Sequence, residues 1–391
     1  MRIAFHGMGG SHWPVGLSFY WNLFHALRLT YGDQVAFLLL AAASDQTAEE
    51  YVHAVSADRI IRYDPLVRGT LRWAVNRFLH RITWRDVTVE KSLRETQVDV
   101  LIAQQVVSKY PRVATLAWFP DFQHRHLPEN FSEEERNLRD RAYARWSQLA
   151  TRVLLMSEAV KRDLEIFMPQ FVHKAHVLPS VSYIPAAIYN ADLGSILEKY
   201  DLPSKFVYLP NQFWKHKNHE CVFRALKLLK DRGTVVALVC TGSSEDYRHP
   251  TYFADLMVKL ELWNIREQVN YLGLVPRDHV FALVRQSVCV LNPSLYEGWG
   301  YTVEEARSIG KKSLLSDIPT HREQNPPGAI FFDPQDVEDL AAKLESIWRN
   351  TMPGPDLQME IAARRGLDGR LRAYAEAFMQ IAQEAVRQVR R

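Results

Sequence analysis

Short apolar runs alternate with longer amphipathic segments along most of the chain. The runs have the length and the β-branched content of buried strands, and the segments between them have the period of helices. In the first half the expected strands cover residues 2–6, 35–43, 98–103, 113–119, 153–156 and 176–179. In the second half they cover residues 206–210, 235–240, 269–275 and 287–291. Strands that alternate with helices pair in parallel, so the pattern predicts an α/β protein with two sheets.

A polar, poorly patterned stretch at residues 185–203 separates the two sets of strands and is the expected linker. A chain of 391 residues suits two α/β domains of ordinary size. We therefore expect an N-terminal domain over residues 1–190, a C-terminal domain over residues 191–370 and a last helix over residues 371–391.

One stretch of the second half carries the strongest pattern. The apolar run at residues 287–291 leads into a glycine-rich turn, and the segment after the turn reads as a helix stopped by Gly310. Gly298 and Gly300 allow the backbone to approach a ligand without a Cβ in the way. The N-terminus of the helix then offers N–H groups to an anion such as a diphosphate. Glu297 and Glu305 flank the turn, and a carboxylate accepts hydrogen bonds from a sugar diol.

The run Pro-Ser-x-x-Glu-Gly-x-Gly-x-x-x-x-Glu-Ala at residues 293–306 resembles the donor site of retaining glycosyltransferases of family 4, also called group 1. The resemblance implies a GT-B fold, in which two Rossmann-like domains with parallel sheets face a central cleft. It places Glu297 in the catalytic site by the donor sugar, and Glu305 on the ribose of the nucleotide. It also implies donor contacts for the residues between them, Gly298, Trp299, Gly300, Tyr301 and Thr302. An ordinary strand–turn–helix in an α/β core is the alternative.

The resemblance extends to a basic loop after the strand at 206–210. Relatives carry an Arg there and a Lys about six residues later, both on the donor diphosphate. Lys217 fits the Lys and is expected to stabilise the leaving phosphate. Asn211 occupies the Arg position, and Lys215 is a candidate for the missing charge. A solvated basic turn would have the same composition.

Two loops of the first half contain further candidate residues, one for donor binding and one for catalysis. Gly10 lies in a glycine-rich loop that in the family faces the donor phosphate, although a tight turn explains it equally well. After the strand at 113–119, relatives place a His, often followed by Asp. Here Asp121 fits the Asp, but Pro120 stands at the His position. His124 is preferred over His126 as the substitute, because it lies nearer the strand end; both could instead only brace the loop.

The segment Leu66 to Arg85 is basic and amphipathic. Four arginines recur among its apolar side chains: Arg68, Arg72, Arg81 and Arg85. Such a helix can lie on anionic lipid. A surface helix with its apolar side on the domain core gives the same pattern.

Composition excludes several classes of protein. Net charge is only +3, from 48 basic and 45 acidic residues, so we expect no nucleic-acid partner. The three cysteines, Cys221, Cys240 and Cys289, lack metal or disulfide spacing, which favours the cytoplasm. No apolar run reaches the roughly 18 residues of a membrane span. We expect no metal and no cofactor, and a cytoplasmic protein, peripheral on the inner face of the plasma membrane if Leu66 to Arg85 binds lipid.

The expected reaction is the retaining transfer of a hexose, with mannose among the candidates, from a nucleotide-sugar to a hydroxyl. The acceptor would be a saccharide or a lipid-linked saccharide in bacterial polysaccharide or glycolipid assembly. Two alternatives stay open. One is an epimerase acting on a nucleotide-sugar, and the other is a non-catalytic protein that binds one.

Overall fold

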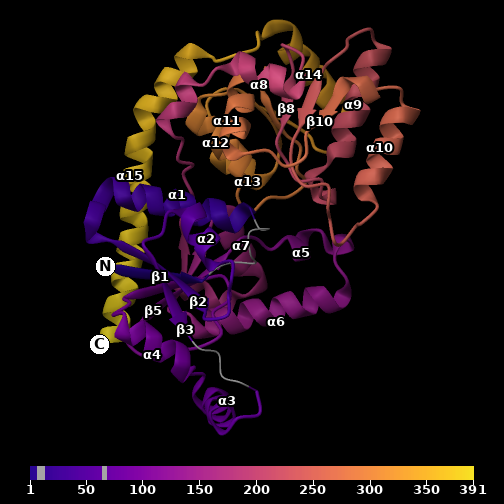
Figure 1. Cartoon of the computed structure of the whole chain (residues 1–391). Helices are drawn as coiled ribbons and strands as arrows, with labels where there is room; N and C mark the ends of the chain where they lie inside the picture. Colours follow the sequence, from indigo (N-terminus) through magenta and orange to yellow (C-terminus); the bar gives the residue numbers. More distant parts are fainter. Residues whose placement is uncertain (7–13, 64–67) are drawn as a thin grey trace. The chain divides into compact units, whose positions relative to one another are not determined.

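The computed structural model describes residues 1–6, 14–63 and 68–391 (Figure 1). Gly10 and Leu66 lie outside the described residues, as do the side chains of Pro14, Val15 and Arg72. The described residues form two sheets, and every strand pair in both sheets is parallel. The α/β class expected from the alternating pattern is therefore confirmed.

The first sheet has the strand order β3-β2-β1-β4-β5-β6-β7. Its strands are β1 (Arg2–His6), β2 (Ala36–Ala42), β3 (Arg59–Tyr63), β4 (Val100–Ala103), β5 (Ala114–Phe119), β6 (Arg152–Leu155) and β7 (Ala175–Val177). The helices of this half are α1 (Pro14–Tyr31), α2 (Ala48–Val55), α3 (Leu71–Thr83), α4 (Val87–Glu95), α6 (Glu133–Leu149) and α7 (Glu158–Phe167). β4 and β5 are buried at every position, which explains their unbroken apolar runs.

The second sheet has the order β10-β9-β8-β11-β12-β13. Its strands are β8 (Val207–Leu209), β9 (Leu238–Cys240), β10 (Val269–Tyr271), β11 (Val290–Asn292), β12 (Ser313–Ser316) and β13 (Ala329–Phe332). The helices are α8 (Leu193–Tyr200), α9 (His219–Asp231), α10 (Tyr252–Leu262), α11 (Arg277–Gln286), α12 (Tyr301–Ile309), α13 (Pro319–Gln324) and α14 (Val337–Asn350). The sheet order reverses between β8 and β11, and ligands of open α/β sheets bind at such a reversal.

Some elements differ from the expected ones. The sequence pattern does not predict β3, β12 or β13, which have five, four and four residues and are too short for periodicity to separate from a buried helix segment. The last helix, α15, spans Leu357–Arg390 and begins 14 residues before the expected position 371. Gly366 and Gly369 lie inside it, where a Cβ would meet nothing within 4 Å.

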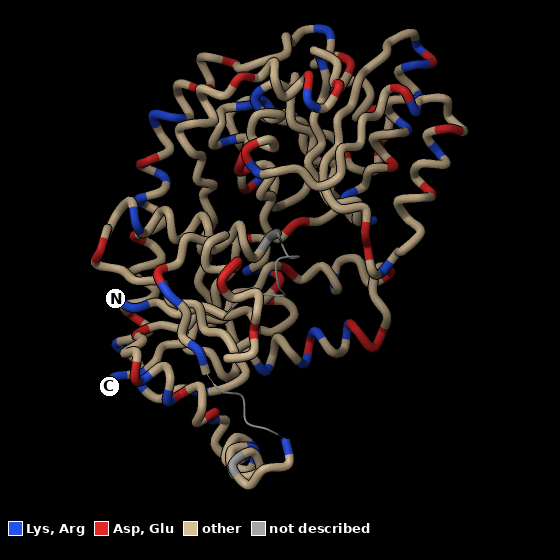
Figure 2. The backbone as a smooth tube through the Cα atoms, in the orientation of Figure 1, with Lys and Arg blue, Asp and Glu red and all other residues tan. Residues whose placement is uncertain are grey.

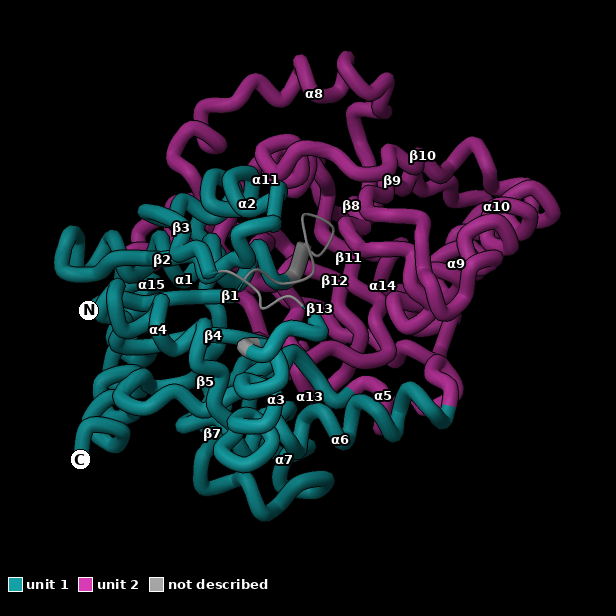
Figure 3. Tube along the Cα trace, turned by 60° about the horizontal axis from the view of Figure 1, so that its bottom comes forward, with its two compact units in different colours: residues 1–122, 133–183, 369–391 teal, residues 123–132, 184–368 magenta. Residues whose placement is uncertain are grey.

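The chain forms two compact units (Figure 3). Unit 1 contains residues 1–122, 133–183 and 369–391, and unit 2 contains residues 123–132 and 184–368. The short segment 123–132, with α5 (Gln123–His126) and the 3₁₀ turn Pro128–Asn130, thus lies in unit 2, whereas the sequence places it in the N-terminal domain. Lys, Arg, Asp and Glu are interspersed over both units (Figure 2), as a net charge of +3 allows. No helix within the described ranges is long and apolar enough to cross a bilayer.

Candidate functional site

The turn between β11 and α12 positions the first carboxylate. Ser294 Oγ lies 2.6 Å from Oε1 of Glu297 and 2.7 Å from Oδ1 of Asn292, the last residue of β11. Thr320 Oγ1 donates to the carbonyl of Glu297 at 2.6 Å. Glu297 is only 9% exposed, so these contacts hold its carboxylate in one place at the carboxyl end of the sheet.

Lys217 pairs with this carboxylate. Its Nζ lies 2.6 Å from Glu297 Oε1, and the two side chains are 14% and 9% exposed. The loop that carries Lys217 is fixed by Asn218, which has a left-handed backbone with φ 57° and donates to the carbonyls of Pro293 and Pro334. The structure thus brings together Lys217, expected on the donor diphosphate, and Glu297, expected by the donor sugar.

Asn211 and Lys215 have different environments from Lys217. Asn211 is 3% exposed and donates to Asn292 Oδ1 at 3.1 Å, so its side chain braces β11. A Cβ on Gly242, whose φ is +131°, would lie 2.5 Å from the carbonyl of Asn211, so only glycine lets these backbones meet. Lys215 is exposed, and its backbone N–H donates to Asp246 at 3.3 Å. The structure therefore offers no charge at position 211, although the family expects one.

Gly300 ends the turn as the N-cap of α12 and has no side chain that caps the helix. Its carbonyl accepts from Gln324 Nε2 at 3.0 Å, and a Cβ at this position would lie 2.8 Å from Gln324 Oε1. Thr302, in the first turn, accepts from Asn292 Nδ2 at 2.9 Å. Trp299 is 9% exposed, and Tyr301 is half-buried at the first position of the helix. The helix N-terminus with its partial positive charge therefore lies directly after the Glu297 turn.

Glu305 lies on α12, one turn further into the helix, and is 8% exposed. Burial raises the pKa of this carboxyl above its ordinary value of 4.5, and the nearby Arg277 opposes that shift. Arg277 Nη2 lies 3.3 Å from Glu305 Oε1. The sequence does not predict this contact, because nothing in the spacing of Arg277 shows that the start of α11 approaches α12.

The buried side chains behind the turn escape the sequence reasoning. His321 is fully buried, and burial lowers its pKa to about 4. Its Nδ1 lies 2.9 Å from the carbonyl of Ser316, whose hydroxyl donates to the carbonyl of Ser294 at 2.6 Å. This neutral imidazole directly follows Thr320, which donates to the carbonyl of Glu297. The only local signal is the Pro-Thr-His run that begins α13.

The segment 123–132 places His126, and not His124, beside this turn. The ring of His126 stacks on Tyr296 with centroids 4.7 Å apart and an interplanar angle of 24°. His124 is 0% exposed and meets Phe131 edge-on at 6.3 Å. Asp121 belongs to unit 1, where burial first and then the Asp121 carboxylate raise the pKa of Tyr143. The preference for His124 therefore stays a prediction, and the contact with Tyr296 makes His126 the second candidate.

Arg248 attaches this segment to unit 2, and the sequence reasoning missed it. Its guanidinium donates to Asp246 at 3.0 Å and to Gln123 at 2.8 Å, and it lies 5.0 Å from the ring centroid of Phe131. The side chains of Arg248 and Asp246 are 8% and 1% exposed. His249 Nε2 adds a contact of 3.1 Å to Asn130. A buried guanidinium that donates hydrogen bonds to both Asp246 and Gln123 thus links the segment to the loop that follows β9.

Residues 197–365 match the family model of glycosyl transferases group 1. This part of the chain is a group 1 glycosyltransferase domain. It contains Lys217, Glu297 and Glu305, so the resemblance read from the motif is confirmed for the domain that carries it.

Several curated relatives are named as bacterial mannosyltransferases. The chain is 27% identical over 187 residues to the O-antigen chain mannosyltransferase RfbU of Salmonella typhimurium, which covers 44% of this chain and 50% of that protein. It is 30% identical over 112 residues to the O-antigen chain mannosyltransferase B of Escherichia coli, and this match covers 27% of this chain and 28% of that protein. The matches thus span half or less of these relatives.

Solved structures match over the whole chain. A glycosyltransferase from Rickettsia africae has a TM-score of 0.68 at 15% identity, covering 98% of both chains. Anabaena HepE in complex with UDP and glucose has a TM-score of 0.63 at 16% identity, covering 100% of this chain and 99% of that one. At such identities the likeness concerns the fold, and it confirms the expected GT-B fold of two Rossmann-like domains.

Within the described ranges no three His, Cys, Asp or Glu side chains gather in a way that could hold a metal ion.

Proposed function

We propose that this glycosyltransferase moves a hexose from a nucleotide-sugar to a hydroxyl of a saccharide acceptor with retention of configuration. The observation that carries the proposal is the Lys217–Glu297 pair at 2.6 Å, next to the N-terminus of α12. Lys217 from its own loop, together with the carboxylate and the helix N-terminus of the Glu297 turn, matches the three parts of a sugar diphosphate: phosphate charge, sugar hydroxyls and the bridging oxygens.

In this proposal each group acts on a different part of the donor. An ammonium has three N–H donors, so Lys217 can keep its contact with Glu297 and still donate to the leaving phosphate. Negative charge grows on that phosphate as the glycosidic bond breaks, and a fixed cation in a buried site stabilises it. Glu297 accepts from the sugar hydroxyls, and Glu305 accepts from the ribose diol. We assign no nucleophile.

Mannose is the proposed donor sugar, because curated relatives are named O-antigen chain or serotype-specific mannosyltransferases. The acceptor would then be a growing polysaccharide, free or lipid-linked. An epimerase would need an acid and a base on opposite faces of the sugar, and a non-catalytic binding protein would hold the donor without turnover. Product analysis with and without acceptor separates both from transfer.

A peripheral position on the inner face of the plasma membrane is proposed from α3. Four apolar side chains on one side of this helix face solvent: Leu71, Val75, Phe78 and Ile82 are 81%, 49%, 64% and 62% exposed. Their spacing of four, three and four residues forms one stripe. Arg81 is exposed beside it, and Arg77 lies over the ring of Trp73 at 5.1 Å. An apolar stripe in water flanked by arginines fits an anionic bilayer surface.

The experiment that tests the function is a panel of nucleotide-sugars, scored first by thermal shift and then by product analysis with and without a saccharide acceptor. A bound donor raises the melting temperature by mass action. We expect one mannose nucleotide to stabilise the protein and to give an α-configured product from an α-configured donor. Inverted products would refute retention, and turnover of the sugar nucleotide without acceptor to an epimer would refute transfer.

A further inference from the structure

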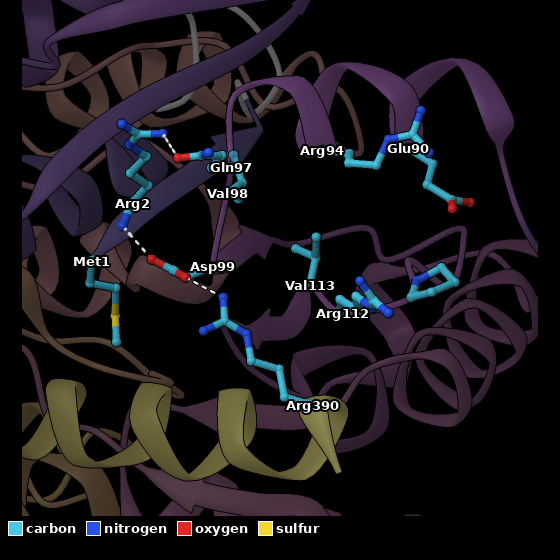
Figure 4. Close-up of a pocket in the computed structure, with 11 residues that line it drawn as sticks. Met1, Arg2, Glu90, Arg94, Gln97, Val98, Asp99, Arg112, Val113 and Arg390 are labelled. Atoms are coloured by element: carbon cyan, nitrogen blue, oxygen red, sulfur yellow. Dashed lines mark hydrogen bonds and ion pairs between the residues drawn. The ribbon is translucent and has the colours of Figure 1, made fainter.

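Unit 1 contains a cavity of about 880 Å³ at the amino ends of β1, β4 and β5, the sheet edge opposite to the one where ligands of such folds usually bind (Figure 4). Four arginines line it from four separate segments: Arg2 at the start of β1, Arg94 on α4, Arg112 before β5 and Arg390 at the end of α15. Only two carboxylates, Glu90 and Asp99, are among its lining residues.

Both carboxylates already have partners. Glu90 accepts two hydrogen bonds from Arg85, at 2.6 and 2.9 Å. Asp99 accepts from Arg390 at 2.5 Å and from the backbone N–H of Arg2 at 2.8 Å (Figure 4). The guanidinium of Arg2 is held by neutral groups, the Thr96 carbonyl at 3.0 Å and Gln97 Oε1 at 2.9 Å. The structure gives the guanidinium groups of Arg94 and Arg112 no hydrogen bond or ion pair with any residue it describes. Three positive charges around the cavity thus lack a carboxylate partner.

The backbone of this cavity wall is costly to form. Gln97 and Arg112 have φ values of 53° and 69°, in the left-handed region that favours glycine or asparagine. Gln97 stands just after α4, at the position where helices usually end on glycine, and its side chain there holds Arg2. Arg112 follows Pro111 in a turn closed by the Val113 N–H on the Tyr110 carbonyl at 3.2 Å. Gln97 and Arg112 both occupy strained backbone positions in the wall of one cavity, which indicates that their side chains have a role there.

We propose that this cavity binds a phosphate-bearing ligand through Arg2, Arg94 and Arg112. Guanidinium groups bind phosphate oxygens in pairs of parallel hydrogen bonds. A volume of about 880 Å³ suits a small molecule such as a sugar phosphate or a lipid headgroup rather than a polymer. The site lies wholly within unit 1 and does not depend on the donor chemistry of unit 2.

Isothermal titration with pyrophosphate tests the site. All variants carry Lys217→Ala, so that the diphosphate contact proposed in unit 2 is removed. Arg94→Gln with Arg112→Asn should weaken binding by about tenfold or more, because each charged hydrogen-bond partner is lost. Asparagine tolerates the left-handed backbone, so this double variant should keep its melting temperature. The matched control is Arg59→Gln, an exposed arginine at the start of the edge strand β3.

A second titration distinguishes the two sources of phosphate. Vesicles with and without phosphatidylglycerol are added to the same variants, all of which also carry Ser in place of Leu71, Val75, Phe78 and Ile82, so that the vesicle contact proposed for α3 is removed. If the parent protein binds pyrophosphate tightly and the double variant does not, the ligand of the cavity is a free phosphate compound. Binding only to the anionic vesicles, again lost in the double variant and kept by Arg59→Gln, assigns a headgroup. The proposal is overturned if the double variant binds both probes as the control does, or if neither probe binds.

Discussion

Lys217 Nζ and Glu297 Oε1 lie 2.6 Å apart, although the two residues are 80 positions apart in the sequence. The two side chains are 14% and 9% exposed, so neither charge is well solvated without the other. Removing one partner of such a pair leaves an uncompensated charge and costs about 3–5 kcal/mol when burial is complete. Mutations at this pair therefore report on stability as well as on chemistry, and each activity measurement needs a melting temperature beside it.

Lys217→Ala should lower turnover by about 10²-fold or more, because the leaving phosphate loses its fixed cation. Donor affinity should change less than turnover, since phosphate charge grows toward the transition state. Lys215→Ala is the control, because Lys215 is an exposed lysine in the same loop. Steady-state kinetics at a temperature where both variants are folded measures the effect. A damaging Lys215→Ala together with a silent Lys217→Ala would show that the wrong lysine has been assigned.

Glu305→Ala should weaken binding of the free nucleotide by about 1.5–3 kcal/mol, the usual loss of a hydrogen bond to a charged group. Titration calorimetry with the nucleotide alone measures this loss. Unchanged affinity would refute the ribose assignment.

The same contact should depend on pH. Burial raises the pKa of Glu305 above 4.5, so its carboxylate becomes neutral at a less acidic pH than an exposed one, and nucleotide affinity should fall as pH drops through that raised pKa. Arg277 lowers the pKa of Glu305, so Arg277→Ala should move the fall in affinity to higher pH. Nucleotide titrations of both proteins across the acidic range test this; a midpoint that stays in place or moves to lower pH contradicts the coupling.

His126→Ala should reduce transfer by up to about 10²-fold, because the ring that stacks on Tyr296 helps to place the turn of Glu297. Its melting temperature should stay near that of the wild type, since His126 is exposed. His124→Ala should do the opposite and lower the melting temperature, because that ring is fully buried. Full activity in His126→Ala, with a loss of activity in His124→Ala that exceeds its loss of stability, would restore the sequence preference for His124.

Replacing Leu71, Val75, Phe78 and Ile82 by Ser should release the protein from anionic vesicles. Each fully buried side chain of this kind is worth about 1.5–3 kcal/mol, and each arginine near the surface about 1 kcal/mol. Removing Arg68, Arg72, Arg81 and Arg85 should therefore weaken binding less than removing the stripe. Vesicle sedimentation at low salt measures both, with Leu262→Ser on α10, 76% exposed in unit 2, as the control. A wild-type protein that stays in the supernatant would contradict the membrane proposal.

The sequence by itself determines most of the alternation of strands and helices, with β3, β12 and β13 as exceptions, and the turn around Glu297. Both are encoded locally: apolar runs must be buried, Gly310 ends α12 with φ 88°, and the spacing of Glu297 and Glu305 places both at one strand–turn–helix junction. Arg277 illustrates the limit of this reasoning, because its approach to Glu305 depends on how α11 packs against α12 and on nothing in its own neighbourhood.

Only the tertiary structure decided where the remaining groups lie. Residues 123–132 follow a strand of unit 1 but pack in unit 2, because Arg248 and His249 form hydrogen bonds with Gln123 and Asn130. No local sequence pattern predicts these hydrogen bonds. The apolar stripe of α3 has the same period whether it faces a core or solvent, and its exposure depends on which elements cover it. Side chains far apart in the sequence meet because packing satisfies burial and hydrogen bonding for the whole chain at once, and that balance cannot be read from any one segment.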